Sequence, residues 1–281
     1  MSLLSKQQGR TPYYKTIRAL GIRYLGAVAQ SAKMMYSYIH DVATYSIYLA
    51  PANMSGYEVC PCSKFCRNFC LNGSGRNKSD ILMRGYEQSI INRSRIKKTK
   101  LFFEQRQVFI DLMIHEIECA RKRAEKDDME FAVRINCTSD INPEWFKDEL
   151  TGKNILELFP DVQFYDYTKV PSRLSLMNKY PNYDLTFSYN GHNTDTCLKF
   201  LAAGGKVAVV FANQENLPMN FLGYPVIDAN GYDMRYMDPK SSIMGLHYHA
   251  TAANYKNGVY TPPTDDFVVN DDDDNIKWFG E

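Results

Sequence analysis

EFAVRINCTSD, residues 130–140, is a short apolar run that ends in a polar cluster, and this pattern decides the fold. It recurs every 20 to 35 residues, roughly the length of a βα unit, with segments of helical character in between. The predicted strands are TYSIYLAP (44–51), EFAVRIN (130–136), VQFYDYT (162–168), DLTFSYN (184–190), KVAVVFA (206–212) and SIMGLHYH (242–249), with PVIDAN (225–230) as a weaker candidate. Strands that alternate with helices predict an α/β fold with a parallel sheet.

The chain divides into three parts around these strands. The strands begin near residue 44, a cysteine-rich loop follows the first of them, and a long helical stretch precedes the second. We expect an N-terminal helical segment (1–43), an α/β domain (44–262) with a cysteine loop (60–76) and a helical insertion (79–126), and an acidic C-terminal tail (263–281).

The composition excludes several classes of protein. The 281 residues include 33 Lys and Arg against 32 Asp and Glu, a net charge of +1, which argues against a nucleic-acid coat or a binder of acidic lipids. The 44% of hydrophobic residues can bury a full core. No apolar run approaches the roughly 20 residues of a membrane span, and the N-terminus lacks the pattern of a secretory signal. We therefore expect a cytoplasmic protein.

Four of the seven cysteines lie in CPCSKFCRNFC, residues 60–70. Cys62, Cys66 and Cys70 recur at about one helical turn, and Cys60 stands next to Pro61. Clustered thiols in a reducing compartment bind soft metals. A compact loop of three or four thiolates is typical of an iron–sulfur site, whereas zinc usually takes two separated knuckles. Iron–sulfur, zinc and an unmetallated loop remain alternatives.

Two of the other cysteines carry no such pattern. Cys119 lies within an amphipathic helical stretch, and Cys197 precedes an apolar run. We expect both to be small buried residues.

Polar clusters follow most of the predicted strands. In barrels and open parallel sheets, ligands bind at the C-terminal ends of the strands, so these clusters are candidates for one binding edge. Turn formation and helix capping are the alternative for each of them. The clusters are Asn136–Asp140, Asp166–Lys169, Ser188–Asn190, Asp228–Asn230 and His247–His249.

The order of one strand, a three-cysteine loop and then βα units resembles the radical S-adenosylmethionine (SAM) enzymes. Cys62-x3-Cys66 matches the first interval of their cysteine motif, and Phe69 stands directly before Cys70 like their aromatic residue, although the second interval is one residue longer. The resemblance implies a partial (β/α)6 barrel with N-terminal and inserted helices. It also implies a [4Fe–4S] cluster and SAM as cofactors.

This resemblance also implies roles for individual residues. Cys62, Cys66 and Cys70 would ligate the cluster, and Cys60 would be an alternative ligand or a neighbour. Asp140, Lys169 and His247 are the catalytic candidates that it suggests. The candidates for binding SAM are Asn136, Ser139, Ser188 and Asn190.

The chain also resembles a group of proteins encoded by phages and plasmids, over roughly residues 45–250. Shared features are the cysteine loop that ends in Leu-x-x-x-Gly, the strand Arg134–Asp140 and the strand Phe164–Lys169. This resemblance implies no particular reaction. If a phage encodes the chain, the cytoplasm expected for it is that of the host cell.

The alternative to a radical SAM enzyme is a protein of a different class: a zinc-stabilised phage protein that binds nucleic acid and has no redox chemistry. The basic stretch 93–106, in which Phe102 and Phe103 are interleaved, has the composition of a surface that binds the phosphates of a nucleic acid. A solvent-exposed helix face with no partner has the same composition. An enzyme that modifies a nucleic acid or a nucleotide-derived substrate would combine the two classes. Asp233 and Arg235 fit either recognition of a polar group or, more simply, a surface ion pair.

Overall fold

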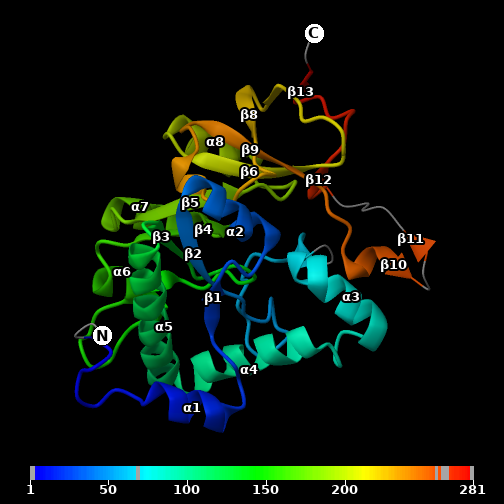
Figure 1. Cartoon of the computed structure of the whole chain (residues 1–281). Helices are drawn as coiled ribbons and strands as arrows, with labels where there is room; N and C mark the ends of the chain where they lie inside the picture. The colour runs from blue at the N-terminus through cyan, green and yellow to red at the C-terminus, as the bar shows by residue number, and fades with distance from the viewer. Residues whose placement is uncertain (1–3, 68–69, 257–258, 261–265, 279–281) are drawn as a thin grey trace.

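The computed structural model describes residues 4–67, 70–256, 259–260 and 266–278, and an eleven-stranded sheet forms its centre. Figure 1 shows the strands across the middle of the molecule, with helices packed around them. The predicted α/β class is confirmed.

Seven strands form a continuous parallel core. In sheet order they are β2 (Val42–Ile47), β3 (Glu130–Arg134), β4 (Gln163–Thr168), β5 (Tyr183–Ser188), β6 (Lys206–Phe211), β9 (Ser242–His247) and β8 (Tyr224–Asp228). Each neighbouring pair is parallel. These strands correspond to the predicted ones, including the weaker candidate at 225–230. Because they are parallel, their carboxyl ends lie at one edge of the sheet.

Short strands complete the sheet on both sides. β1 (Gly26–Val28) pairs antiparallel with β2, while β7 (Asn220–Phe221) and β13 (Ile276–Lys277) continue antiparallel beyond β8. β12 (Val268–Val269) pairs in parallel with the end of β6. Within the described ranges the strand path runs from β1 to β13, and these two ends do not pair with each other.

The C-terminal segment that we expected as a tail is held to the sheet. Val268, Val269 and Ile276 are buried, so β12 and β13 contribute to the core. The acidic run 271–274 lies between these two strands and is largely exposed. Residues 263–265 and 279–281 lie outside the described residues.

The N-terminal segment, expected to be helical over residues 1–43, also contains β1. Helix α1 (Tyr13–Leu20) ends at Gly21, which adopts the left-handed conformation with φ 59°, and α2 (Ala32–Tyr36) and η1 (Ser37–His40) follow β1. Gly26 lets β1 approach β2, because a Cβ there would lie 2.5 Å from Cζ of Tyr45.

Three helices form the predicted insertion between β2 and β3. They are α3 (Gly75–Arg84), α4 (Ile90–Glu104) and α5 (Arg106–Lys126). Ser89 caps α4 by accepting a hydrogen bond from the backbone N–H of Asn92. Helix α5 packs against β1, β2 and β3 through a buried apolar stripe of Phe109, Ile110, Met113, Ile114 and Ile117.

The remaining connections contain short helices: η3 (Leu71–Gly73), η4 (Pro143–Trp145), α6 (Ile155–Leu158), η5 (Pro171–Ser175), α7 (Leu176–Lys179), α8 (Thr194–Ala202), η6 (Arg235–Met237) and η7 (Ala252–Asn254). β10 (Tyr255–Lys256) and β11 (Val259–Tyr260) form a separate antiparallel hairpin. Figure 1 shows this hairpin beside α3, away from the large sheet.

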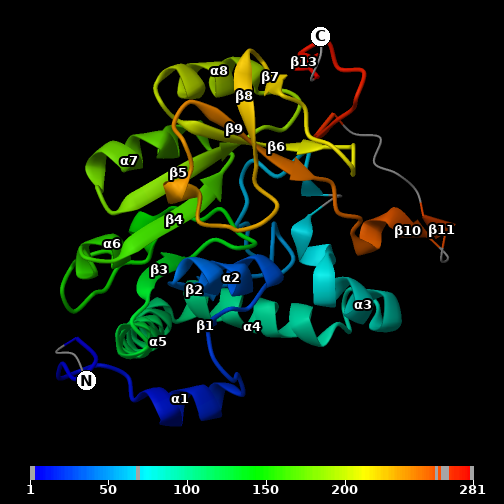
Figure 2. The same ribbon diagram turned by 45° about the horizontal axis from the view of Figure 1, so that its top comes forward.

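The sheet separates two differently packed faces. Val133 lies in the main hydrophobic core with α5, while its neighbour Ala132 packs on the opposite face with Tyr165 and Met234. Figure 2 shows α5, α6, α7 and α8 along one side of the sheet and α2 on the other. On that second side, the Lys33 ammonium of α2 donates to the carbonyl of Ala229 at 2.9 Å.

Candidate functional site

The carboxyl ends of the parallel strands bring the predicted polar clusters to one edge of the sheet. Asn136–Asp140 follows β3, Lys169 follows β4, Asn190 lies just beyond β5, and His247–His249 ends β9. The cysteine loop belongs to the same edge, because it lies on the connection that leaves β2. Ligands of parallel α/β proteins bind at this edge.

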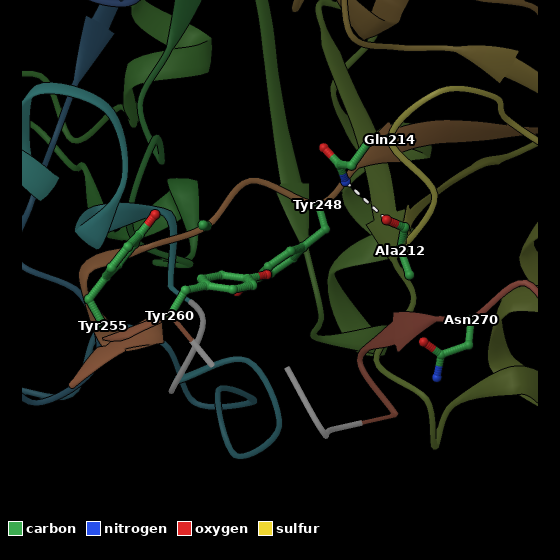
Figure 3. Close-up of a pocket in the computed structure, with 7 residues that line it drawn as sticks. Ala212, Gln214, Tyr248, Tyr255, Tyr260 and Asn270 are labelled. Carbon is green, nitrogen blue, oxygen red and sulfur yellow. Dashed lines mark hydrogen bonds between the residues drawn. The ribbon is translucent and has the colours of Figure 1, made fainter. Parts of the chain in front are cut away.

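One part of this edge, at the ends of β6, β9 and β12, is hollowed into a pocket of about 400 Å³ (Figure 3). We call it the tyrosine pocket. The described residues that line it are Ala212, Gln214, Tyr248, Ala250, Tyr255, Tyr260 and Asn270.

The cysteine loop is anchored to the segment that follows β3. The backbone N–H of Asp140 donates to the carbonyl of Val59 at 2.8 Å, and the Thr138 hydroxyl donates to the carbonyl of Leu49 at 2.6 Å. Cys60 Sγ lies 3.4 Å from the backbone N of Ala52. These contacts place the start of the loop over the ends of β2 and β3.

The thiols of the loop are partly buried and lie within electrostatic range of one another. Burial raises the pKa of Cys60 to about 12, and it also raises the pKa values of Cys62 and Cys70. The charge of Cys66 raises all three pKa values further, while Lys169 lowers those of Cys62 and Cys70. Burial therefore favours the protonated thiol at Cys60, Cys62 and Cys70.

The thiols are not gathered around a single point. Among the described residues, no three His, Cys, Asp or Glu side chains are grouped closely enough to hold a metal ion. Phe69, which the cysteine motif singles out, lies outside the described residues together with Asn68. Cys70 Sγ accepts a hydrogen bond from the backbone N–H of Asn72 at 3.5 Å.

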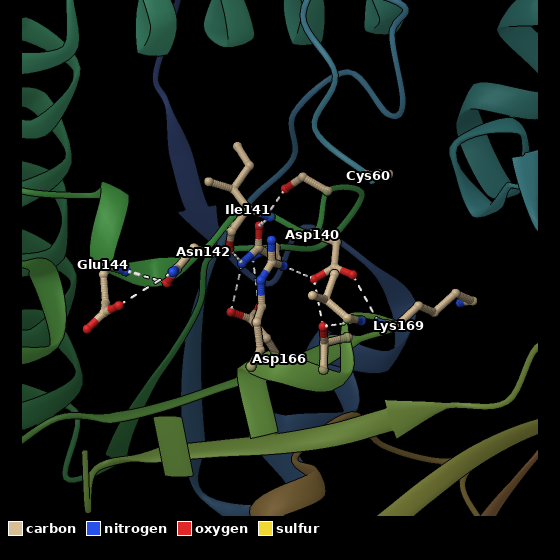
Figure 4. A network of polar contacts seen from close by, with 12 residues as sticks. Cys60, Asp140, Ile141, Asn142, Glu144, Asp166 and Lys169 are labelled. Carbon is tan, nitrogen blue, oxygen red and sulfur yellow. Dashed lines mark hydrogen bonds and ion pairs between the residues drawn. The ribbon is translucent and has the colours of Figure 1, made fainter. Parts of the chain in front are cut away.

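Asn136 and Ser139 are engaged in a buried network under the loop (Figure 4). Asn136 donates from its backbone N and from Nδ2 to the carboxylate of Asp166, at 2.8 and 3.1 Å. Its Oδ1 accepts from the Ser139 hydroxyl and from the backbone N–H of Ile141. These two candidates for SAM binding thus already have protein partners.

Asp166 is central to this network, and sequence reasoning gave it no role of its own. Burial raises its pKa from 3.8 to about 7, although Arg134 and the hydrogen bonds from Asn136 and Tyr183 act in the opposite direction. In the sequence it stood out only as the first residue of the polar cluster Asp166–Lys169.

Asp140 and Lys169 lie next to the cysteine loop. The Asp140 carboxylate forms an ion pair with Arg173 and accepts hydrogen bonds from the Thr168 hydroxyl at 2.9 Å and from the backbone N–H of Lys169 at 3.0 Å. The Lys169 ammonium lies 5.3 Å from the ring centre of Phe267. Asp140 therefore joins the ends of β3 and β4.

Ser188, Asn190 and His247 are spread along the same edge. Ser188 is buried, and its carbonyl accepts from the Asn193 side chain at 3.0 Å. Asn190 Oδ1 accepts from the backbone N–H of His192 at 2.9 Å. His247 Nδ1 lies 2.7 Å from the carbonyl of Asn213, so Nδ1 is the donor in this hydrogen bond.

The basic stretch 93–106 does not form one cationic surface. Arg93, Lys97 and Lys100 are exposed on α4, but Lys98 is buried and donates to the carbonyl of Leu25 at 2.7 Å. The Arg106 guanidinium lies 4.7 Å from the ring centre of Phe102.

Arg95 from this stretch points toward the cysteine loop, and sequence reasoning missed this role. It donates to Asn72 Oδ1, and its guanidinium lies 4.9 Å from the ring centre of Tyr48. Burial lowers its pKa, while the charges of Tyr48, Cys137 and Cys70 raise it. No carboxylate in the described ranges pairs with Arg95.

Two smaller expectations were wrong. Asp233 and Arg235 do not form a surface ion pair with each other: both are buried, with Asp233 paired to Arg134 and Arg235 to Asp238. Cys119 is exposed on α5 rather than buried, whereas Cys197 is buried as predicted.

A family model described as gene product 88 matches residues 12–260, which is most of the chain. The chain belongs to the gene product 88 family. The match includes all seven parallel strands, the cysteine loop and the β10–β11 hairpin, and this family assignment agrees with the predicted resemblance to phage proteins. No curated protein and no solved structure matched the chain. None of the described helices has the length and apolar character needed to cross a membrane.

Proposed function

We propose that this member of the gene product 88 family is an iron–sulfur enzyme of the radical SAM type. In this proposal Cys62, Cys66 and Cys70 ligate a [4Fe–4S] cluster. The observation that carries it is the position of the cysteine loop, which the Asp140–Val59 hydrogen bond holds at the carboxyl edge of the sheet. A cluster on this loop would face the edge where parallel α/β proteins bind ligands.

For the fold, we propose that β2, β3, β4, β5, β6 and β9 are the six strands of a partial (β/α)6 barrel. They follow one another in sheet order, and all of them are parallel. Their second face is rich in buried polar groups: Arg134 pairs with Asp233, whose carboxylate also lies 3.4 Å from the Tyr167 hydroxyl. A polar face of this kind suits the interior of a ligand-binding barrel.

The donor set supports an iron–sulfur cluster. Four thiols come from one short loop, and Cys70 accepts a backbone N–H···S hydrogen bond of the kind that tunes cluster sulfurs. Burial raises the pKa of the Cys70 thiol, and the charges of Arg95 and Lys169 partly offset this rise in favour of the thiolate. Since the thiols are not gathered in advance, we expect the loop to close as the cluster binds, because metal binding is commonly coupled to folding.

Cys60 fits the role of a supporting thiol. Its sulfur accepts the backbone N–H of Ala52 and lies 3.9 Å from the Thr138 carbonyl. Cys62 and Cys66, which lie further along the loop, are less constrained by backbone contacts. We therefore assign the three cluster ligands to Cys62, Cys66 and Cys70 and place Cys60 behind them.

The cluster, when bound, would supply the electron for reductive cleavage of SAM. Asp140, held by Arg173 and Thr168, would fix the end of β3 beneath the loop. The Lys169 ammonium would bind the carboxylate of SAM, and Nε2 of His247 would accept a proton from the substrate. Asn136 and Ser139, with their internal hydrogen bonds, would support this edge, while Ser188 and Asn190 remain candidates for contact with SAM.

The test is SAM cleavage by the reduced, iron-loaded protein, followed as release of methionine and 5′-deoxyadenosine. Cys66→Ser should abolish cleavage, whereas Cys119→Ser should retain it, because Cys119 is exposed on α5 and lies outside the loop. Release of neither product by a wild-type protein that contains its full cluster would refute the radical SAM proposal. Equal activity of the Cys66→Ser variant would refute the ligand assignment.

A further inference from the structure

The tyrosine pocket is a second feature of the carboxyl edge, and none of its described lining residues belongs to the cysteine loop. Its volume of about 400 Å³ lies within the range of small-molecule sites, roughly 300 to 1,000 Å³. The segment Thr251–Ala252, between β9 and the hairpin, packs against Gly73 at the end of the cysteine loop. The pocket and the loop are therefore neighbours on one edge.

Aromatic rings form one side of the pocket. Tyr255 and Tyr260 are cross-strand partners in the β10–β11 hairpin, with ring centres 5.7 Å apart and ring planes at 57°. Tyr248 is buried, and its hydroxyl donates to Asn254, which fixes its ring. Figure 3 shows the Tyr248 and Tyr260 rings extending toward each other, with Tyr255 beside them. Such rings bind flat ligands by stacking.

Neutral amides form the polar part of the lining. Gln214 Nε2 donates to the Ala212 carbonyl at 3.0 Å, which orients the side chain. Gln214 and Asn270 are both exposed, and neither Gln214 Oε1 nor the Asn270 amide bonds to another described residue, so both are open to a ligand. Amides offer both a donor and an acceptor, which suits the edge of a nucleobase, and none of the described lining residues is charged.

The rim beside the hairpin is positively charged. The Lys78 ammonium of α3 lies 5.4 Å from the ring centre of Tyr255. Burial lowers the pKa of His249, and the charges of Lys33, His247 and Lys78 lower it further. The Lys78 ammonium beside Tyr255 would therefore stabilise an anion bound at this rim. A neutral sugar would gain nothing from these charges.

We infer that the tyrosine pocket binds a nucleotide, with its base against Tyr260 and Tyr255 and its phosphate at Lys78. A free mononucleotide and a nucleotide within a single strand present the same groups. The inference does not depend on the cluster, because Gln214, Asn270 and the tyrosines belong to other segments than the cysteine loop.

Calorimetric titration of the full chain with each of the four ribonucleoside monophosphates, and with short single-stranded RNA, tests this inference. Base stacking on an aromatic ring is worth about 1–3 kcal/mol, so Tyr260→Ala should weaken binding roughly 5- to 150-fold. Tyr260→Phe should bind within about twofold of the wild type because it keeps the ring. Tyr260 is 47% exposed, so its replacement should leave the fold intact.

Three control variants test the stacking, the phosphate contact and the independence from the cluster separately. Tyr14→Ala, on the exposed surface of α1, should bind like the wild type. Lys78→Gln should weaken nucleotide binding but leave binding of the uncharged nucleoside unchanged. Cys66→Ser should still bind the nucleotide, which distinguishes failure of this inference from failure of the cluster proposal. Binding of RNA but not of mononucleotides would identify a nucleic acid as the source of the nucleotide.

Several results would overturn the inference. One is equal affinity of the wild type and Tyr260→Ala. Another is the absence of binding for every mononucleotide and for RNA at about 1 mM, the weak end of specific binding. A third is tighter binding of a neutral sugar such as glucose than of any nucleotide.

Discussion

Asp166 offers a sharp test of how the carboxyl edge is built. Its carboxylate is buried and accepts hydrogen bonds from Asn136 and Tyr183. Burial raises its pKa from 3.8 to about 7. The folded protein thus holds a proton that the unfolded chain releases at a lower pH. The resulting stabilisation is complete below about pH 3.8 and is lost as the pH rises through about 7.

The size of the effect follows from these two pKa values. At about 1.4 kcal/mol per pH unit, the interval between 3.8 and about 7 corresponds to about 4 kcal/mol. Asparagine does not titrate, so the stability of the wild type relative to Asp166→Asn should fall by about this amount between about pH 4 and pH 8. Urea unfolding of both proteins across this range measures the difference.

A matched control is Asp161→Asn, because Asp161 is an exposed carboxylate that pairs with Arg121 at the surface. This variant should follow the pH dependence of the wild type. A stability difference between the wild type and Asp166→Asn that stays constant from about pH 4 to pH 8 would refute the assignment of a buried, proton-binding carboxylate.

Three further predictions concern packing, ion pairing and metal binding. Gly26→Ala should destabilise the protein by about 1–3 kcal/mol in urea unfolding because its Cβ would meet the Tyr45 ring, whereas Gly231→Ala, with open space around it, should be nearly neutral. Arg10→Ala should lower the free energy of unfolding by about 3–5 kcal/mol because it removes the ion-pair partner of two buried carboxylates, Asp111 and Asp148. Arg121→Ala removes only an exposed ion pair and should leave Tm almost unchanged. Iron binding, measured by chelator competition, should tighten with rising pH, because burial raises the pKa values of the Cys62 and Cys70 thiols, which bind iron as thiolates. Weaker binding at high pH would contradict a thiolate site.

The parallel core could be predicted from the sequence because each strand is a compact apolar run followed by polar residues. KVAVVFA became β6, and SIMGLHYH became β9, since both are buried on two faces and leave little ambiguity of register. β1 could not be predicted in this way. It is three residues long and depends on the close approach of Gly26 to Tyr45, which is a tertiary contact.

The position of the cysteine loop also followed from the sequence, because a loop after a parallel strand must emerge at the carboxyl edge. The polar residues beneath it were harder to predict. Arg95 reads as part of a basic stretch, but it shares a helix face with Asn92 and Thr99, both buried polar residues, and this face points inward. Such a polar inward face gives no hydrophobic periodicity from which its direction could be inferred.

The buried roles of Asp233 and Arg235 were hidden for a similar reason. Each finds its charge partner elsewhere, Arg134 for Asp233 and Asp238 for Arg235. A carboxylate and a guanidinium two residues apart suggest a local pair, and only the packing of this segment over the second face of the sheet separates them.

The most direct test of the central proposal is the metal content of the anaerobically purified full chain, measured as iron, sulfide and zinc on one sample. We predict about four irons and four sulfides per chain, as a [4Fe–4S] cluster requires, with loss of both in Cys62→Ser, Cys66→Ser and Cys70→Ser but not in Cys119→Ser. About one zinc without iron would contradict the iron–sulfur proposal and favour a structural zinc site in a nucleic-acid-binding protein.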